Sequence, residues 1–281
     1  MSQPHPPMAA VRAAVSRALE EDLSPLGDLT TGLLPAPADV VAFLVPRSEG
    51  VLAGTLCTQE AFCQVDPSVR VTWRSEEGEE VDAGQVVAQV EGNLSSILTA
   101  ERTALNFLGH LSGVATLTRR FVRATYGQAR VRDTRKTTPG LRALEKAAVR
   151  AGGGVNHRGS LSDGILLKDN HMPGLGIDQA VARARLHWPG RSVEVECDTV
   201  EQVEQAAGAG ADMVLLDNMD TAEVSRCVLA VAGRCLVEVS GGIDLDSVRF
   251  YAEAGVDFVS VGAITHSAPV LDIGLDLEAP G

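Results

Sequence analysis

The fold is decided by a stretch in the second half of the chain, SVEVECDTVEQVEQAAGAGADMVLLD, at positions 192–217. It begins and ends with a short apolar run, and the segment between the two runs has a helical pattern. A strand, a helix and a second strand in this order are typical of repeated βα units with a parallel sheet. The stretch therefore predicts an α/β protein.

The same alternation continues on both sides of this stretch. Further apolar runs are ARVRDTR at 129–135, GILLKD at 164–169, CLVEV at 235–239 and FVSV at 258–261. A closed eight-stranded barrel needs about 200 residues or more, whereas about 140 lie between positions 129 and 267. We therefore expect an incomplete α/β barrel of six or seven strands, within a domain over 113–269.

Each predicted strand of the barrel ends at a polar residue or a glycine. These residues are Lys168, Glu196, Asp217, Ser240 and Gly262. Successive members are 28, 21, 23 and 22 positions apart, which is close to the length of one βα unit. In a βα barrel the active site is built at the carboxyl ends of the strands. The spacing therefore predicts that these residues share one rim.

Residues 1–112 are expected to form a separate, mixed α/β domain. A helix is predicted over 9–23 and another near 56–65, and short strands are predicted at 40–45, 69–73 and 85–90. The last segment, LDIGLDLEAPG at 271–281, can pack on either domain.

A long amphipathic helix over 99–122 is expected to bridge the two domains, with Thr99 as its N-cap. Arg102 then falls in the first turn, where the helix macrodipole disfavours a cation. We interpret Arg102 as a residue that faces an anion or a partner. A solvated arginine paired with Glu101 is the alternative.

The whole chain is acidic, with a net charge of −13 and a pI near 4.9. This balance argues against a general nucleic-acid-binding or anionic-membrane surface. No run reaches the roughly 18 apolar residues of a membrane span, and the N-terminus lacks a signal-peptide pattern. The five cysteines, an odd number without a Cys-x-x-Cys pair, favour a reducing compartment. We expect a soluble cytoplasmic protein with no nucleic-acid or membrane partner.

One window departs from this acidic character. Positions 130–171 carry nine basic and four acidic side chains, a net charge of +5, and include every lysine of the chain. The window predicts a local site for a polyanionic small molecule. A basic helix surface over 141–150 is the alternative for part of it. That alternative does not explain Arg135, Lys136, Arg158 and Lys168.

Arg135 and Lys136 follow a predicted strand and precede the turn TTPG at 137–140. We expect Pro139 at the first position of a helix whose backbone N–H groups face an anion. Phosphate or carboxylate recognition is the natural use of such a segment.

Acidic residues at neighbouring strand ends indicate a site for a hard cation. Glu194 and Glu196 lie on one face of their strand, and Asp217 ends the next strand. Mg²⁺ held together with substrate phosphates fits, because Mg²⁺ takes only one or two protein carboxylates. The alternation does not choose between Glu194 and Glu196. No Cys/His spacing indicates zinc.

Glycine-rich loops, SGG at 240–242 and VGA at 261–263, follow the last two predicted strands. Loops at this position of a barrel commonly bind phosphate. Each loop alone is weak evidence, since tight βα turns also favour glycine.

Longer motifs run through nearly the whole chain. They are GDLTT at 27–31, EGVLAG at 49–54, ERTALNFLGHLSGVAT at 101–116, DTRKTTPGLR at 133–142, GGGVNHR at 152–158, LKDNH at 167–171, VEVE at 193–196, LLDNM at 215–219, SGGI at 240–243 and VGAITHS at 261–267. With these motifs the sequence closely resembles the quinolinate phosphoribosyltransferases, the decarboxylating nicotinate-nucleotide pyrophosphorylases of NAD biosynthesis.

The resemblance implies a mixed α/β N-terminal domain, to which the tail at 270–281 returns, and an incomplete α/β barrel. It also implies a pentosyltransferase reaction that needs Mg²⁺. The phosphoribosyl group of phosphoribosyl pyrophosphate passes to the ring nitrogen of quinolinate, and pyrophosphate and then CO₂ leave to give nicotinate mononucleotide.

The resemblance further implies which residues bind the acceptor. The residues expected around the two carboxylates of quinolinate are Arg135, His157, Arg158 and Lys168. Arg102 would arrive from the neighbouring subunit of a homodimer, which would explain its position on the helix.

For the phosphoribosyl donor, the resemblance implies a second set of contacts. Lys136 and Lys168 would contact the donor, and Glu196 and Asp217 its ribose or Mg²⁺. The family pattern matches Glu196 rather than Glu194. Contacts to the 5′-phosphate region are expected from Ser240, Gly241, Gly262 and His266. Thr137, in the same motif as Lys136, is also expected to bind substrate.

Two other classes of function compete with this one. The first is a related phosphoribosyltransferase with a different acceptor, such as the proteins found with molybdenum-transport genes. The second is a barrel that only binds phosphorylated metabolites, or a metal-dependent lyase of the same architecture. Neither the metabolite-binding barrel nor the lyase gives Arg102 a role.

Overall fold

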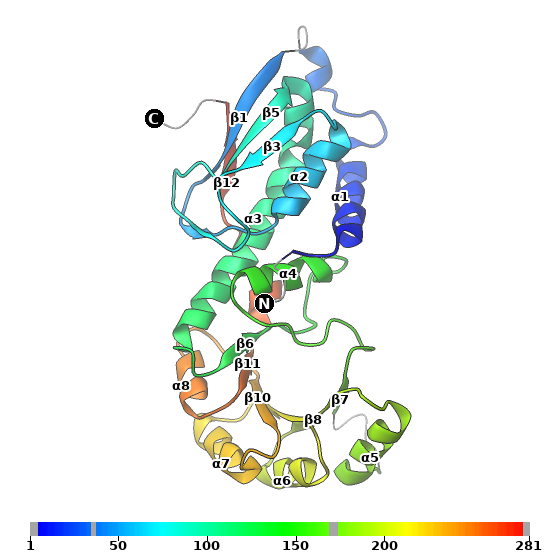
Figure 1. Cartoon of the computed structure of the whole chain (residues 1–281), viewed down its shortest axis with the longest axis vertical. Helices are drawn as coiled ribbons and strands as arrows, with labels where there is room; N and C mark the ends of the chain where they lie inside the picture. Colours follow the sequence, from blue (N-terminus) through cyan, green and yellow to red (C-terminus); the bar gives the residue numbers. More distant parts are fainter. Residues whose placement is uncertain (1–4, 35–37, 169–173, 278–281) are drawn as a thin grey trace. The chain divides into compact units, whose positions relative to one another are not determined.

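A computed structural model of the chain describes residues 5–34, 38–168 and 174–277. Within these ranges the chain forms two compact units (Figure 1). The first takes in Met1–Arg119, Thr137–Gly153 and Ile264–Gly281, and the second Arg120–Lys136 and Gly154–Ala263. The predicted domains were 1–112 with the returning tail 270–281, and 113–269. The observed units are interleaved once more, because the segment 137–153 also belongs to the first unit.

An antiparallel sheet forms the framework of the first unit. Its strand order is β12-β1-β5-β3, with β1 at Asp39–Pro46, β3 at Arg70–Trp73, β5 at Ala88–Asn93 and β12 at Ile273–Asp276. Leu275 of β12 is the register partner of Leu44 in β1. The C-terminal segment is therefore an edge strand of this sheet. A separate small pair joins β2 at Gly50–Val51 to β4 at Glu80–Val81.

Four longer helices and one short 3₁₀ turn belong to the first unit, which also takes in most of the short helix at Ala263–His266. They are α1 at Met8–Leu23, α2 at Thr55–Val65, α3 at Leu94–Ala124, α4 at Arg142–Ala151 and the turn at Thr31–Leu33. Buried residues of α3 recur every three or four positions, as a core-facing helix requires: Ile97, Ala100, Ala104, Leu108 and Leu111. The last five residues of α3 lie in the second unit.

The predicted start of α3 was wrong. The helix begins at Leu94, and the Asn93 side chain accepts the N–H of Ser95 at 3.0 Å, one turn before Thr99. Thr99 instead donates its hydroxyl to Asp28 Oδ2 at 3.0 Å. Arg102 therefore lies in the third turn of α3, and the macrodipole argument about its position does not apply, since that effect is confined to the first turn.

The second unit contains the predicted parallel sheet. Its strand order is β6-β11-β10-β9-β8-β7, with β6 at Arg130–Arg132, β7 at Ile165–Leu167, β8 at Val193–Cys197, β9 at Met213–Asp217, β10 at Leu236–Ser240 and β11 at Phe258–Ser260. Val155 adds an isolated parallel bridge to Arg132. The incomplete barrel of six or seven strands is therefore confirmed.

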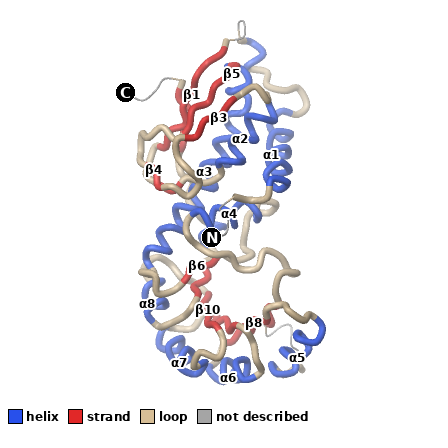
Figure 2. The backbone as a smooth tube through the Cα atoms, viewed as in Figure 1, coloured by secondary structure: helices blue, strands red, loops and turns tan. Residues whose placement is uncertain are grey.

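Helices line the outer side of this sheet (Figures 1 and 2). They are α5 at Ile177–His187, α6 at Val200–Gly208, α7 at Thr221–Val231 and α8 at Val248–Glu253, and a short α9 follows at Ala263–His266. In β8, Val193, Val195 and Cys197 are completely buried. Glu194 and Glu196 alternate with them on the other face, as strand periodicity predicts.

Among the described residues, no helix has the length and apolar character needed to cross a membrane.

Candidate functional site

The carboxyl ends of the barrel strands meet at one edge of the sheet. Asp217 and Ser240 close β9 and β10, and they are register partners in this parallel pair. Lys168 follows β7 directly, and Glu196 lies near the end of β8. Because parallel strands bring their carboxyl ends to the same edge, these side chains share one rim, where barrel enzymes build their active sites.

Lys168 and Glu196 form an ion pair at this rim. The Lys168 ammonium donates to Glu196 Oε2. The Lys168 side chain is 37% exposed and that of Glu196 is 16% exposed, so a ligand can reach both. The pair offers a positive and a negative contact to a ligand that carries, or develops, both charges.

The loops that follow β9 and β10 lie against each other. Gly241 has a φ of +102°, and a Cβ at this position would lie 2.1 Å from Asn218 Oδ1, so only glycine fits. Asn218 donates through Nδ2 to Asp217 Oδ2 at 2.8 Å. Gly241 itself has no side chain, and Asn218 fills the space where its Cβ would lie. Glycine-rich loops at this position of a barrel commonly bind phosphate.

Two arginines interact within the second unit. Arg158 is half-buried, and its Nη1 donates to the carbonyl of Gly164 at 3.1 Å. Burial, and then the positive charge of Arg135, lower the pKa of Arg158, while the charge of Glu194 opposes them. Two positive charges that act on each other in this way are both stabilised by an anion that binds near them. The pair is therefore suited to a ligand with two carboxylates or phosphates.

The backbone next to Arg158 is anchored to the end of β6. Asp133 is completely buried. Its Oδ1 accepts the N–H of His157 at 2.8 Å, and its Oδ2 accepts Nδ2 of Asn156 at 2.5 Å. A carboxylate with these hydrogen bonds ties the 156–158 segment to β6. Sequence reasoning did not assign this role to Asp133, although the residue stands in the DTRK motif.

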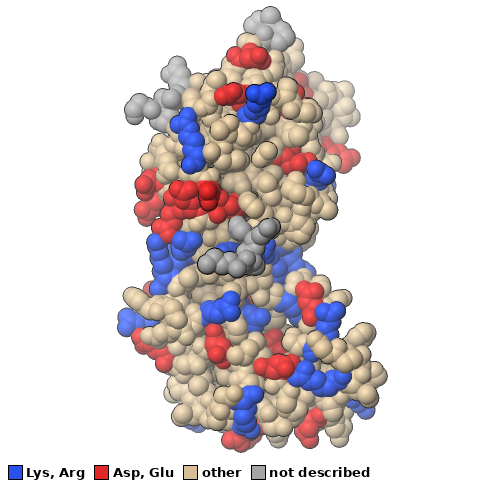
Figure 3. Space-filling model, viewed as in Figure 1, with Lys and Arg blue, Asp and Glu red and all other residues tan. Residues whose placement is uncertain are grey.

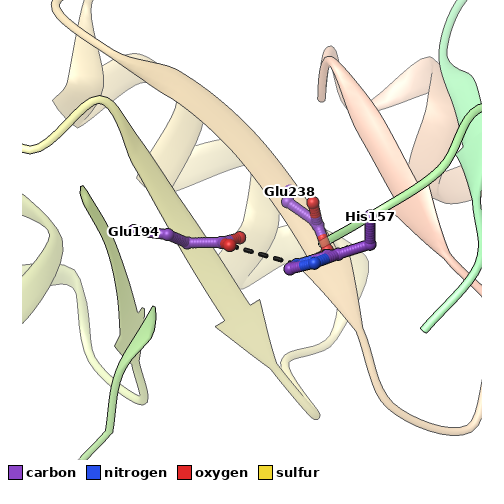
Figure 4. Close-up of side chains that lie close together, drawn as sticks. All are labelled: His157, Glu194 and Glu238. Carbon is purple, nitrogen blue, oxygen red and sulfur yellow. Dashed lines mark ion pairs between the residues drawn. The ribbon is translucent and has the colours of Figure 1, made fainter. Parts of the chain in front are cut away.

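His157 lies between two glutamates of the barrel strands (Figure 4). Its Nε2 is 3.1 Å from Glu194 Oε2 and 3.5 Å from Glu238 Oε1. Its Nδ1 accepts the N–H of Arg158 at 2.7 Å. One ligand atom of each of the three residues falls within 4.8 Å of the others, the grouping of a metal-binding cluster.

Glu238 is completely buried. It accepts a hydrogen bond from Ser260 Oγ at 2.5 Å and another from Arg132 Nη1. Burial, and then the charge of Glu194, raise the pKa of Glu238. Sequence reasoning missed Glu238. The available signal was a charged residue in the middle of the apolar run CLVEV, which strand alternation places on the inward face.

Arg102 belongs to the first unit. Its side chain is 68% exposed, and its Nη2 is 3.8 Å from Glu101 Oε1, so the weak pairing considered as an alternative does occur. Arg102 also lines a cavity of about 410 Å³ together with Arg17, His110 and the turn at 138–141. The arginine is thus accessible at the edge of a hollow within the first unit.

The turn after Lys136 differs from the prediction. Pro139 lies in a turn ahead of α4, whose N-cap is Leu141, and so it is not the first helical residue. The turn is held by buried Glu145, which accepts the N–H of Thr138 at 3.1 Å and contacts His110 Nε2 at 2.9 Å. This tertiary contact, absent from local sequence signals, delays the start of the helix. Thr137 Oγ1 accepts Nε of Arg142 at 3.0 Å.

The predicted site residues are divided between the two units. The second unit contains Arg135, Lys136, His157, Arg158, Lys168, Glu196, Asp217, Ser240, Gly241 and Gly262. The first contains Arg102, Thr137 and His266. His266 ends α9, and its Nδ1 lies 2.6 Å from Ser267 Oγ. Asp169, Asn170 and His171, also in the KDNH motif, lie outside the described residues.

On the face seen in Figure 3, basic and acidic side chains are interspersed over the second unit. Acidic side chains gather over the β4 segment of the first unit on the same face.

The carboxylates of the rim fit a hard cation. Glu196 and Asp217 supply oxygen ligands. Lys168 donates a hydrogen bond to one oxygen of Glu196, and Asn218 donates one to an oxygen of Asp217. Mg²⁺ commonly takes one or two carboxylates and fills its remaining positions with water and phosphate oxygens. This donor set therefore suits Mg²⁺ that arrives with a phosphorylated ligand.

Comparison with known proteins agrees with this geometry. Residues 28–112 match the family described as quinolinate phosphoribosyl transferase, N-terminal domain, and residues 114–276 match its C-terminal domain.

Individual relatives cover almost the whole chain. A nicotinate-nucleotide pyrophosphorylase [carboxylating] of Mycobacterium leprae is 44% identical over 278 residues, 95% of this chain and 97% of the relative. A probable enzyme of the same name from Bacillus subtilis is 41% identical over 89% of this chain and 88% of the relative. The solved structure of the Francisella tularensis nicotinate-nucleotide pyrophosphorylase superposes with a TM-score of 0.94 at 39% identity, covering 98% of this chain and 99% of that one. The chain is therefore a member of the quinolinate phosphoribosyl transferase family.

Proposed function

We propose that the protein transfers the phosphoribosyl group of phosphoribosyl pyrophosphate to the ring nitrogen of quinolinate, in the de novo synthesis of NAD. Pyrophosphate and CO₂ leave, and nicotinate mononucleotide is formed. The observation that carries this proposal is the half-buried Arg158, which donates to the Gly164 carbonyl and follows the segment that Asp133 anchors to the end of β6. With Arg135 two positions after Asp133, it suits an acceptor with two adjacent carboxylates.

The acceptor carboxylates bind to Arg135, Arg158 and Lys168, with His157 beside them. Arg102 comes from the partner subunit of a homodimer and completes this positive pocket. Two features support this assignment: Arg102 is 68% exposed, and among the described residues its ion pair is the weak contact with the adjacent Glu101. The dimer is cytoplasmic, as the composition of the chain predicts.

The donor occupies the strand ends beside the acceptor. Lys136 and Lys168 bind its pyrophosphate, and Glu196 and Asp217 lie at its ribose. The 5′-phosphate region is held by Ser240, Gly241, Gly262 and His266, with Thr137 as a further substrate contact. The glycine-rich loop at 240–242 supports this placement, because loops of this kind at the carboxyl ends of barrel strands commonly bind phosphate.

In the transfer step, the bond between the ribose and pyrophosphate breaks as the ring nitrogen of quinolinate attacks the ribose carbon. The ribose becomes positively charged in the transition state, and the carboxylates of Glu196 and Asp217 stabilise that charge. Lys136 and Lys168 stabilise the negative charge of the departing pyrophosphate. Mg²⁺, bound through Glu196 and Asp217 together with the donor, would supply further neutralisation of that charge.

Decarboxylation follows from the alkylation of the ring. The ring nitrogen is then cationic, and it stabilises the electron pair left on the adjacent carbon when CO₂ departs. A proton added to that carbon completes nicotinate mononucleotide. The arginines and lysines of the pocket position the substrate in both steps and need not gain or lose protons.

The test is an assay of purified protein with phosphoribosyl pyrophosphate, Mg²⁺ and quinolinate, with nicotinate as a parallel acceptor. Nicotinate mononucleotide formed from quinolinate alone, and abolished by a chelator, is the expected result. Product from nicotinate alone would contradict the two-carboxylate pocket. No product from either acceptor, with the donor still bound, would favour a related phosphoribosyltransferase with another acceptor.

A further inference from the structure

Both ring nitrogens of His157 are engaged. Nδ1 accepts the backbone N–H of Arg158 at 2.7 Å, and an accepting imidazole nitrogen carries a lone pair rather than a proton. The ring proton therefore lies on Nε2. That nitrogen faces Glu194 Oε2 at 3.1 Å and Glu238 Oε1 at 3.5 Å, so carboxylate acceptors stand where the proton is. The contacts on the two sides of the ring select the same tautomer.

The two glutamates are differently supported. Glu238 is bound by Arg132 and Ser260. Glu194 is only 7% exposed, and among the described residues its Oε1 has no hydrogen-bond partner. The contact to His157 and the positive charge of Arg158 are therefore the main interactions that offset the cost of burying the Glu194 carboxylate. A buried carboxylate in this situation depends on its neighbours remaining in place.

We propose that His157 is a positioning residue and not a hydrogen-bond donor to the substrate. Glu194 and Glu238 orient the imidazole, Nδ1 then holds the backbone N–H of Arg158, and Arg158 binds an acceptor carboxylate. This inference rests on the proposed function, because that function assigns Arg158 to the acceptor. Asp133 also holds this segment, because its carboxylate accepts hydrogen bonds from the backbone N–H of His157 and from the side-chain amide of Asn156. The position of the Arg158 backbone is thus set by the barrel strands.

The same geometry argues against a metal ion at His157, Glu194 and Glu238. To bind a metal, Nε2 has to give up its proton, and a neutral ring then carries its proton on Nδ1. That proton would point at the N–H of Arg158, 2.7 Å away. Two donors facing each other at this distance repel, and the 156–158 segment would have to move.

The tautomer is tested first, by NMR of wild-type protein labelled at the histidine ring nitrogens, with His157 assigned from its absence in the spectrum of His157→Asn. We expect a protonated Nε2 and an unprotonated Nδ1 at neutral pH, in protein without substrates. A proton on Nδ1, alone or together with Nε2, overturns the proposal. This measurement needs no turnover, so it stands even if the protein does not use quinolinate.

The second test compares His157→Asn with His157→Gln. The asparagine Oδ1 comes near the position of Nδ1 and can accept the Arg158 N–H, whereas the glutamine amide comes near Nε2 and cannot. We expect the KM for quinolinate to rise about 10- to 100-fold in His157→Gln and at least threefold less in His157→Asn. The KM for phosphoribosyl pyrophosphate is expected to stay unchanged in both variants.

The outcomes of this comparison separate a positioning role from direct binding. If His157 donates from Nε2 to a substrate carboxylate, His157→Gln retains more affinity for quinolinate than His157→Asn, which overturns the proposal. Equal losses in the two variants also overturn it, because the Nδ1 position then has no special importance. An absence of any quinolinate turnover in wild-type protein contradicts the proposed function instead.

Discussion

At the scale of single residues, the barrel rim brings opposite charges into contact. Lys168 and Glu196 come from consecutive strands of the sheet, and strand alternation points both side chains to the same face. In the proposed reaction, positive charge develops on the ribose and negative charge on pyrophosphate. Glu196 can therefore stabilise the positive charge on the ribose while Lys168 stabilises the negative charge on pyrophosphate, provided that both side chains keep their positions.

Replacing the lysine of this pair should abolish most turnover. We expect Lys168→Ala to lower kcat about 10²- to 10³-fold, because the departing pyrophosphate loses a preorganised cation. Steady-state kinetics with both substrates measures the effect. The matched control is Arg226→Ala, which removes an exposed cation on α7 that pairs only weakly with Glu223. A Lys168→Ala enzyme with wild-type kcat would remove Lys168 from the mechanism.

Asp212 links two neighbouring elements of the barrel. Its Oδ1 accepts Nη2 of Arg185 at 2.8 Å, and its Oδ2 accepts the N–H of Val193 at 2.7 Å. Burial acts to raise the pKa of Asp212, but these two hydrogen bonds and the positive charge of Arg185 together outweigh it, and the pKa lies below its ordinary value of 3.8. Its ionised form therefore stabilises the fold above that value, and this contribution is lost as the pH falls through the lowered pKa.

We accordingly expect Asp212→Asn to lower the Tm near neutral pH, and the difference from wild type to shrink as the pH falls below 3.8. Thermal unfolding followed by circular dichroism across this range measures the difference. Asp246→Asn, at an exposed position, is the control and should leave the Tm unchanged. A difference for Asp212→Asn that is independent of pH would show that its charge does not contribute.

At the scale of whole elements, α3 shows where local signals and packing disagree. Gly113 lies inside this helix, where glycine is unfavourable by about 1 kcal/mol relative to alanine. A Cβ on Gly113 would lie 2.1 Å from the carbonyl oxygen of Pro269. The glycine therefore allows the C-terminal segment, ahead of β12, to pack closely on the helix.

Gly113→Ala should therefore destabilise the protein despite its better helix propensity. We expect the free energy of unfolding to fall by about 1–3 kcal/mol, as for other overpacked sites. Gly208→Ala is the matched control, since Gly208 ends α6 and has no atom within 4 Å of a Cβ. Urea denaturation of the two variants measures both effects. Equal stability of the two variants would contradict the packing argument.

The same helix explains which elements sequence patterns could predict. Its apolar periodicity indicated a long helix, but Asn93 moved its start from the predicted Thr99 to Leu94. In α4 the start moved in the other direction, because the buried carboxylate of Glu145 holds the turn by accepting the N–H of Thr138. Hydrophobic periodicity thus locates an element, whereas its ends depend on individual polar contacts.

At the scale of the whole molecule, the proposed dimer makes each active site a shared structure. Neither Arg102→Ala nor Lys168→Ala alone is expected to retain much activity. A mixed dimer contains one site with both residues intact, because the Arg102→Ala subunit supplies Lys168 and its partner supplies Arg102. The other site of that dimer lacks both.

Mixing the two inactive variants in equal amounts, with subunit exchange, should therefore restore about a quarter of the wild-type activity, since half of the dimers are mixed and each has one complete site. The assay is the formation of nicotinate mononucleotide after mixing. Native mass spectrometry of the same mixture, with one variant carrying an affinity tag, provides the control for exchange. No recovery despite proven exchange would contradict the shared site.

The sequence by itself determined the class of fold, the strands of the barrel and most candidate site residues, because these depend on periodicity and on motifs read along the chain. Only the tertiary structure showed that Glu194 and Glu238 surround His157, and that Asp133 anchors the segment before Arg158. These residues are distant in sequence, from 133 to 238, and no local pattern relates them. Glu194 and Glu238 come together because strand alternation in a parallel sheet turns both to the same face, and the hydrogen bond from the His157 N–H to Asp133 holds the loop beside them.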